Sequence, residues 1–200
     1  MDKLAETQFP IHDLLRRRWS PLAFADRLVE PEKLRSILEA ARWAASSFNE
    51  QPWCFIVATK QDEPEWSRLL SCLVEGNQVW AKQAPVLMVS VAKLTFGRNG
   101  ESNRHAWHDV GLAVGNLVVQ ATSLGLSVHQ MAGILPDKVR ELYGLPHGFD
   151  PVAGLALGYV GDPDSLPEPL HQREQANRMR KPLAEFIFST RWGQGSPLVT

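Results

Sequence analysis

The most informative stretch of the sequence is Ala45-Ser46-Ser47-Phe48-Asn49-Glu50-Gln51-Pro52-Trp53. It lies between an apolar run with helical spacing and a strand-like run, Cys54-Phe55-Ile56-Val57-Ala58. Pro52 disfavours helical geometry at the residue before it, so the chain is expected to be extended by Gln51. Hydrogen-bonding side chains are concentrated here, at Ser46, Ser47, Asn49 and Gln51. The stretch therefore predicts a polar loop at the end of a strand, which either contacts a ligand or caps its own backbone.

Apolar periodicity places helices and strands in alternation along the rest of the chain. Helices are predicted over residues 10–18, 31–44, 63–74, 104–124, 136–143 and 181–188, and strands over residues 53–59, 85–92, 126–131 and 151–160. Gly76-Asn77 is expected to break the third helix, and residues 93–103 and 161–168 are expected to form loops. The alternation indicates an α/β or α+β fold around one sheet. No interdomain linker is evident, so residues 1–200 are expected to form a single domain.

The predicted helix over residues 104–124 is apolar on nearly every side in its second half. Such a helix must be covered all round. We therefore expect it either at the centre of the molecule or against a second subunit. Gly111 and Gly115 lie four residues apart on one face, which allows another helix to approach closely. Routine packing within one chain explains the same spacing.

Composition excludes several classes of protein. A net charge of -1 gives no electrostatic case for nucleic acid or an anionic membrane as partner. No run reaches the roughly 18 apolar residues that span a bilayer, and residues 1–10 lack the apolar core of a signal peptide. Cys54 and Cys72 have no CxxC spacing, which argues against a disulfide framework or a zinc site. A reducing, cytoplasmic location is expected.

The common catalytic motifs are missing from the sequence. No GxGxxG follows a predicted strand and no Walker loop is present, so a Rossmann dinucleotide site is not supported. Ser46 and Ser47 lack the GxSxG context of a hydrolase nucleophile. His105, His108 and Asp109 have a spacing that can bind a metal. Because no HExxH or further carboxylate set accompanies them, a polar helix start is favoured over a metal-dependent hydrolase.

Two groups of arginines lie far apart in the sequence. Arg16, Arg17 and Arg18 end the first predicted helix, where cations suit the helix dipole, but with Ser20 they could equally hold a phosphate. The second group comprises Arg173, Arg178, Arg180 and Lys181, close to the start of the last predicted helix. Cations there oppose the dipole unless something anionic offsets them or the group lies outside the helix. Together the two groups could clamp one phosphate.

The order of these motifs resembles the FMN-dependent nitroreductase family. The resemblance is carried by Arg18-Trp19-Ser20-Pro21-Leu22-Ala23-Phe24, residues 45–53, Met131-Ala132-Gly133, Gly158-Tyr159 and Arg178-Met179-Arg180-Lys181-Pro182-Leu183. It implies an α+β fold, a three-layer α/β/α sandwich with a mixed, mainly antiparallel sheet. It also implies an intertwined homodimer with FMN at the subunit interface. That would account for the apolar helix and for the seven tryptophans.

The resemblance also implies a set of FMN-binding residues and no catalytic side chain. The set comprises Arg17, Arg18, Trp19, Ser20, Ser46, Ser47, Asn49, Met131, Ala132, Gly133, Arg178 and Arg180. The arginines and Ser20 would hold the phosphate, and the serine stretch would reach the flavin of the partner subunit. A backbone N–H at Ala132 or Gly133 would face flavin N5. Two residues depart from the family pattern: Leu22 stands where a cation often tunes the flavin, and Ala45 where proline is common.

The function implied is that of an oxidoreductase using FMN and NAD(P)H by a ping-pong mechanism. NAD(P)H would donate hydride to N5 and leave, and a small acceptor such as a nitroaromatic, quinone or enal would take its place. Residues 93–103 would shape the choice of acceptor. The alternatives are a module that binds or sequesters FMN without turnover, which the Leu22 departure favours, and the metal-dependent hydrolase.

Overall fold

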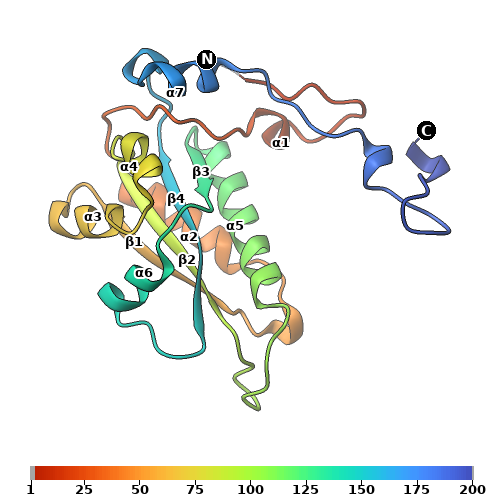
Figure 1. Ribbon diagram of the computed structural model, residues 1–200, viewed down its shortest axis with the longest axis horizontal. Helices are drawn as coiled ribbons and strands as arrows, with labels where there is room; N and C mark the ends of the chain where they lie inside the picture. The colour runs from red at the N-terminus through yellow and green to blue at the C-terminus, as the bar shows by residue number, and fades with distance from the viewer. Residues whose placement is uncertain (1–2, 200) are drawn as a thin grey trace.

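The computed structural model describes residues 3–199 and is built on a four-stranded sheet (Figure 1). Its strands are β1 (Trp53–Thr59), β2 (Val86–Lys93), β3 (Ser127–Met131) and β4 (Phe149–Gly158), in the order β1-β2-β4-β3. All three neighbouring pairs are antiparallel, with Val57 opposite Met88 and Val89 opposite Gly154. The mainly antiparallel sheet is therefore confirmed, and the described strands contain no parallel pair.

Helices cover both faces of the sheet and complete the three layers (Figure 1). Successive side chains of a strand point to opposite faces, and β2 has apolar residues on both. Val86 and Met88 pack with α2 (Pro31–Arg42) and α5 (Ala106–Ser123), whereas Leu87 and Val89 pack against the opposite layer. That layer contains α3 (Glu63–Leu70), α4 (Glu75–Ala81) and α6 (Pro136–Tyr143). The result is the expected α/β/α sandwich.

Helix α5 is buried along most of its length but keeps one exposed strip. Its residues Val110, Ala113, Leu117 and Ala121 are buried with the sheet and α2. Trp107 and Leu112 are exposed, and a Cβ placed on Gly111 or Gly115 would meet no other atom within 4 Å. The apolar strip is therefore free for another surface to approach.

The prediction of a helix over residues 63–74 that breaks at Gly76-Asn77 is wrong. Helix α3 ends at Leu70, and Gly76 and Asn77 lie inside the separate helix α4. The Asn77 side chain donates to the Gly133 carbonyl (Nδ2 to O, 2.9 Å), a contact 56 residues distant in sequence. Asn77 therefore lies in a helix and makes a tertiary hydrogen bond, although asparagine by itself favours turns and caps.

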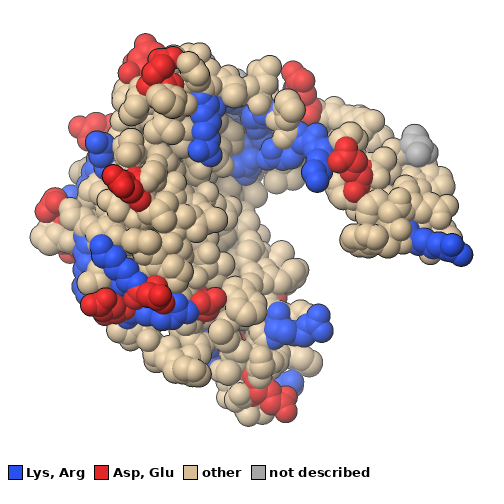
Figure 2. All heavy atoms as spheres, in the orientation of Figure 1, with Lys and Arg blue, Asp and Glu red and all other residues tan. Residues whose placement is uncertain are grey.

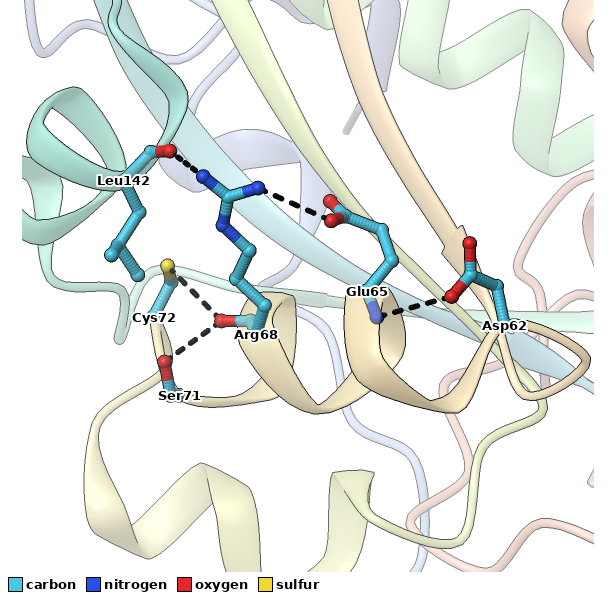
Figure 3. A network of polar contacts seen from close by, with 6 residues as sticks. All are labelled: Asp62, Glu65, Arg68, Ser71, Cys72 and Leu142. Carbon is cyan, nitrogen blue, oxygen red and sulfur yellow. Dashed lines mark hydrogen bonds and ion pairs between the residues drawn. The ribbon is translucent and has the colours of Figure 1, made fainter.

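A polar network ends α3 and connects it to α6 (Figure 3). At the start, Asp62 Oδ1 accepts the Glu65 backbone N–H at 3.3 Å and caps the helix. At the end, the Ser71 hydroxyl and the Cys72 thiol both converge on the Arg68 carbonyl, at 2.8 and 3.6 Å. The Arg68 guanidinium reaches Glu65 and the carbonyl of Leu142, at the end of α6.

The C-terminal region departs most from the sequence prediction. Residues 181–188 do not form a helix beyond the short 3-10 turn η3 (Leu183–Glu185), so that prediction is wrong. Instead α7 (Glu168–Gln175) forms, partly within a stretch expected to be turn-rich. After α7 the chain runs past α1 (Asp13–Arg17) and away from the sheet as an arm, residues 176–199 (Figure 1). Large apolar side chains on this arm are exposed, with Trp192 at 93%.

Short segments complete the described chain. They are the 3-10 turns η1 (Ser47–Asn49), η2 (Pro163–Ser165) and η4 (Pro197–Val199). The loop predicted over residues 93–103 begins after Lys93, the last residue of β2, and is closed by an isolated bridge between Thr95 and Ser102. Among residues 3–199, no helix combines the length and hydrophobicity required to cross a membrane.

Candidate cofactor-binding site

A cavity of about 230 Å³ lies where the C-terminal arm leaves the body of the molecule. Its lining includes Arg18, Trp19, Ser20, Arg178 and Arg180, so the structure brings together five predicted site residues from the two ends of the sequence. Arg18 follows α1, and its Nη1 donates to Ser20 Oγ at 3.3 Å. Lys and Arg side chains gather at this junction in the space-filling view (Figure 2).

The three arginines Arg18, Arg178 and Arg180 form a cationic group without an acidic partner among the described residues. Burial lowers the pKa of Arg18, and the neighbouring charges of Arg178 and Arg180 lower it further. Burial followed by the charge of Arg180 likewise lowers the pKa of Arg178. No carboxylate of the described residues forms an ion pair with any of the three. Guanidinium groups stay protonated in proteins, so the cavity is suited to an anion such as a phosphate monoester.

Two other predicted residues of this region have different surroundings. Arg17 forms an ion pair with Asp13 within α1 (2.6 Å) and does not line the cavity. Trp19 lines the cavity, and the ammonium of Lys3 lies 5.1 Å from the centroid of its ring. The geometry thus favours Arg18 over Arg17 as a phosphate ligand.

A buried carboxylate connects two of the segments that line the cavity. It belongs to Glu174 in α7, which is 2% exposed. Its Oε2 accepts the Leu22 backbone N–H at 2.9 Å, and its Oε1 accepts that of Ala23 at 3.3 Å. Arg178 Nη1 also donates to the carbonyls of Lys3 (2.6 Å) and Arg16 (3.1 Å). Glu174 was not among the predicted site residues, because nothing in the sequence distinguishes a buried Glu from an exposed one in a polar segment.

His129 of β3 lines the same cavity and was also missed. Its Nδ1 lies 2.8 Å from the Pro21 carbonyl oxygen, and its ring packs on Trp80 with centroids 4.5 Å apart. Burial lowers the pKa of His129, the Pro21 hydrogen bond raises it, and the charge of Arg173 lowers it, with a net decrease. A neutral ring that donates through Nδ1 to Pro21 keeps Nε2 as an acceptor.

The segment Met131-Ala132-Gly133 continues the strand that carries His129. Ala132 is the first residue after β3 and lies three residues beyond His129, roughly 10 Å along the extended chain at ~3.3 Å per residue. Ala132 is exposed, and the backbone N–H groups of Ala132 and Gly133 have no partner among the described residues. A Cβ on Gly133 would lie 2.6 Å from Asn77 Nδ2 and 2.7 Å from Val74 Cγ2, so packing against α4 requires this glycine.

The serine stretch forms a tight turn with an unusual backbone. Phe48, Asn49 and Gln51 all have positive φ, of 52°, 56° and 53°. The expectation that the chain is extended by Gln51 is therefore wrong. The Gln51 N–H instead donates to Ser46 Oγ at 3.0 Å and closes the turn. Ser46 thus caps its own backbone.

This turn lies at the opposite end of α5 from β3. Asp109, in the first turn of α5, accepts the Ser47 backbone N–H through Oδ2 at 2.9 Å. From Asp109 to the end of α5 at Ser123 the helix spans about 21 Å, at 1.5 Å per residue, and β3 begins four residues later. Within one chain, the structure does not bring Ser46, Ser47 and Asn49 to the cationic cavity.

The histidines at the start of α5 do not form a metal centre in the described residues. Ser46, Ser47, His105, His108 and Asp109 line a second cavity of about 260 Å³. His108 Nδ1 lies 3.1 Å from Asp109 Oδ1, and the other oxygen of Asp109 is used by Ser47. No group of three or more His, Cys, Asp or Glu side chains within residues 3–199 is placed to hold a metal ion.

Comparison with known proteins identifies the class to which this fold and site belong. Residues 15–71 and 59–159 match the Nitroreductase family, and the chain belongs to that family. A solved structure described as an oxidoreductase containing FMN is 36% identical, with a TM-score of 0.89 and 96% of each chain covered. A nitroreductase family protein from Clostridium difficile 630 is 27% identical, with a TM-score of 0.70 and coverage of 92% of this chain and 99% of the other.

Curated relatives include enzymes named for flavin chemistry. The FMN reductase [NAD(P)H] of Bacillus subtilis is 28% identical over 70% of this chain, which spans 61% of that enzyme's length. The major NAD(P)H-flavin oxidoreductase of Aliivibrio fischeri is 27% identical over 74% of this chain and 86% of its own.

Proposed function

We propose that this nitroreductase-family chain is an FMN-dependent oxidoreductase that passes reducing equivalents from NAD(P)H to a small organic acceptor. The observation that carries the proposal is the group of Arg18, Arg178 and Arg180, three cations around one cavity with no acidic partner among the described residues. An FMN phosphate supplies the missing negative charge. The names of the relatives, which include FMN and NAD(P)H reductases, support the same activity.

The residues of the cavity fit FMN at both ends. Arg18, Ser20 and Arg180 would bind the phosphate, while Arg178 also fixes the arm through the carbonyls of Lys3 and Arg16. The backbone N–H groups of Ala132 and Gly133, which have no partner within residues 3–199, would donate to the flavin ring. When bound, FMN supplies the hydride chemistry, and the protein supplies position and electrostatics. No side chain is assigned a proton-transfer role.

A second copy of the chain would complete the site. Ser46, Ser47 and Asn49 lie beyond the reach of the cavity in their own chain, so their contact with flavin requires a partner subunit. The exposed strip of α5 and the apolar arm are surfaces that a partner would cover, because exposed side chains such as Trp107 and Trp192 are favoured at interfaces. A ping-pong order follows if donor and acceptor use one open face of the flavin in turn. In this proposal residues 1–200 act as one FMN-binding domain.

The absorbance spectrum of the purified protein, supplied with FMN, tests the proposal. We expect a bound-flavin spectrum that is bleached under anaerobic conditions by NADH or NADPH and restored by a quinone or nitroaromatic. Bound flavin without bleaching would instead support a module that only binds FMN. A colourless protein that does not bind added FMN would overturn both functions, and bound metal in it would point to the hydrolase. Sedimentation at the mass of a monomer would contradict the shared site.

A further inference from the structure

The turn that carries the predicted flavin contacts also presents an exposed aromatic side chain. Phe48 lies between Ser47 and Asn49 and is 74% exposed. Its φ of 52° is unfavourable for a bulky residue. A strained backbone that holds an apolar ring in solvent does not stabilise the isolated chain, and such strain is characteristic of binding sites.

A guanidinium and a second ring pack against Phe48. The Arg98 guanidinium carbon lies 4.2 Å from the centroid of Phe48 and 5.3 Å from that of Phe96. The two rings meet edge to face, with centroids 5.9 Å apart. Phe96 is buried and Arg98 is exposed, so the inner ring supports the outer pair.

The loop that provides Phe96 and Arg98 is fastened to the turn by Glu50. Its Oε1 accepts the Gly97 N–H at 2.7 Å and lies 3.1 Å from Lys93 Nζ. These two contacts lower the pKa of Glu50, and the charge of Arg98 adds to the decrease. Arg98 itself contacts the two rings and forms no ion pair or hydrogen bond within residues 3–199.

We propose that Phe48 and Arg98 form the acceptor-recognition surface and select planar aromatic acceptors that carry a carboxylate or another anionic group. The ring of the acceptor stacks on Phe48, and its anion pairs with the Arg98 guanidinium, which forms no ion pair within residues 3–199. This inference rests on the proposed function, since Ser47 and Asn49, on either side of Phe48, place it beside the flavin of a second copy.

Two acceptors that differ only in charge test the inference, 4-nitrobenzoate and its neutral amide, 4-nitrobenzamide. Equilibrium binding of each to the oxidised, FMN-loaded protein is measured by titration calorimetry, and kcat/KM is measured with saturating NAD(P)H. We expect the wild-type protein to bind the carboxylate more tightly. Arg98→Met should weaken binding of 4-nitrobenzoate and lower its kcat/KM about tenfold, with less than a twofold change for the amide.

Matched variants separate recognition from general effects. Arg98→Lys should retain much of the preference for the carboxylate, and Phe48→Leu should weaken binding of both compounds. Arg35→Met removes the same charge from the exposed face of α2. It should leave the acid-to-amide ratio unchanged, both for the binding constants and for kcat/KM. Thermal unfolding of each variant checks that a loss of binding is not a loss of folding.

The remaining outcomes are distinguishable. Equal binding of acid and amide by the wild-type protein overturns the inference, as does an Arg98→Met variant that changes only the preference between NADPH and NADH. Selective binding of the acid by a protein that NAD(P)H does not bleach supports the recognition surface while the proposed redox function fails.

Discussion

The Asp109 carboxylate, 2% exposed in the first turn of α5, accepts the backbone N–H of Ser47 at 2.9 Å. This hydrogen bond joins the serine turn to the longest helix of the protein. The other oxygen of Asp109, Oδ1, lies 3.1 Å from Nδ1 of the exposed His108 ring and has no other polar partner among residues 3–199. Asp109 is therefore the residue that positions the turn, although it was considered in the sequence only as a weak metal ligand.

Replacing Asp109 by Asn should destabilise the protein. The amide can present an oxygen to Ser47 N–H, but that hydrogen bond loses the charge of the carboxylate, and the NH₂ group takes the place of the oxygen that faces the exposed His108 ring. We expect the free energy of unfolding to fall by about 1–2 kcal/mol, measured by urea denaturation. His108→Ala removes the other, exposed partner and should change it by no more than about 0.5 kcal/mol. Equal losses in the two variants would contradict the assignment of Asp109 as the anchor of Ser47.

Replacing Arg18 by Met should weaken FMN binding selectively. The variant removes one of three cations that form no ion pair within residues 3–199, so the Kd for FMN should rise about tenfold or more, while that for riboflavin, which lacks the phosphate, changes little. Quenching of flavin fluorescence measures both constants. Arg35→Met, far from the cavity in sequence and paired with Glu32 at 2.9 Å, controls for the loss of net charge. A parallel loss of FMN and riboflavin binding would exclude a phosphate role.

Replacing Glu174 by Gln should loosen the junction between the arm and the body. One of its two carboxylate oxygens becomes an NH₂ group facing the backbone N–H of Leu22 or Ala23. A buried donor opposite a donor costs about 1–3 kcal/mol of folding free energy. Glu168→Gln, exposed on the same helix, should cost less than about 0.5 kcal/mol. If both variants unfold at the wild-type urea concentration, the two hydrogen bonds are not stabilising.

Replacing Tyr159 by Phe should change the acid dependence of stability. The Tyr159 hydroxyl donates to Glu30 Oε2 at 2.6 Å and is the main reason that the pKa of Glu30 is lowered from 4.5 to about 2. Between these pH values the unfolded chain binds more protons at Glu30 than the folded one. The stabilisation from this group is therefore present above pH 4.5 and is lost as the pH falls toward 2.

In Tyr159→Phe, the pKa of Glu30 should rise toward 4.5, and less stability should be lost on acidification through this window. Carboxyl NMR titration measures the pKa, and urea denaturation at several pH values measures stability. The pKa of Glu39, also about 2 because of Arg42 and Trp43, provides an internal control that the variant should leave unchanged. An unchanged Glu30 titration would refute the assignment.

The local sequence pattern was sufficient to predict several elements in the central part of the fold. β1 and α6 begin and end at the predicted residues, because strand and helix propensity there agree with the apolar period. Around Asn77 and in residues 181–188 the local preference and the tertiary contacts disagree. Asn77 is helical because Gly133 accepts its side chain, and the arm stays irregular where a short apolar pattern indicated a helix.

The candidate site, like the fold, was predicted from the sequence only in part. The residue types of the sequence by themselves determined that two groups of arginines are present, for which they predicted a phosphate ligand, and that a polar turn has the spacing seen in the family. Only the tertiary structure decided that Arg18, Arg178 and Arg180 share one cavity, that Glu174 and His129 belong to it, and that the serine turn lies at the far end of α5. The reason is physical: residue type and spacing express local chemistry, whereas burial and the meeting of distant segments depend on how the whole chain packs.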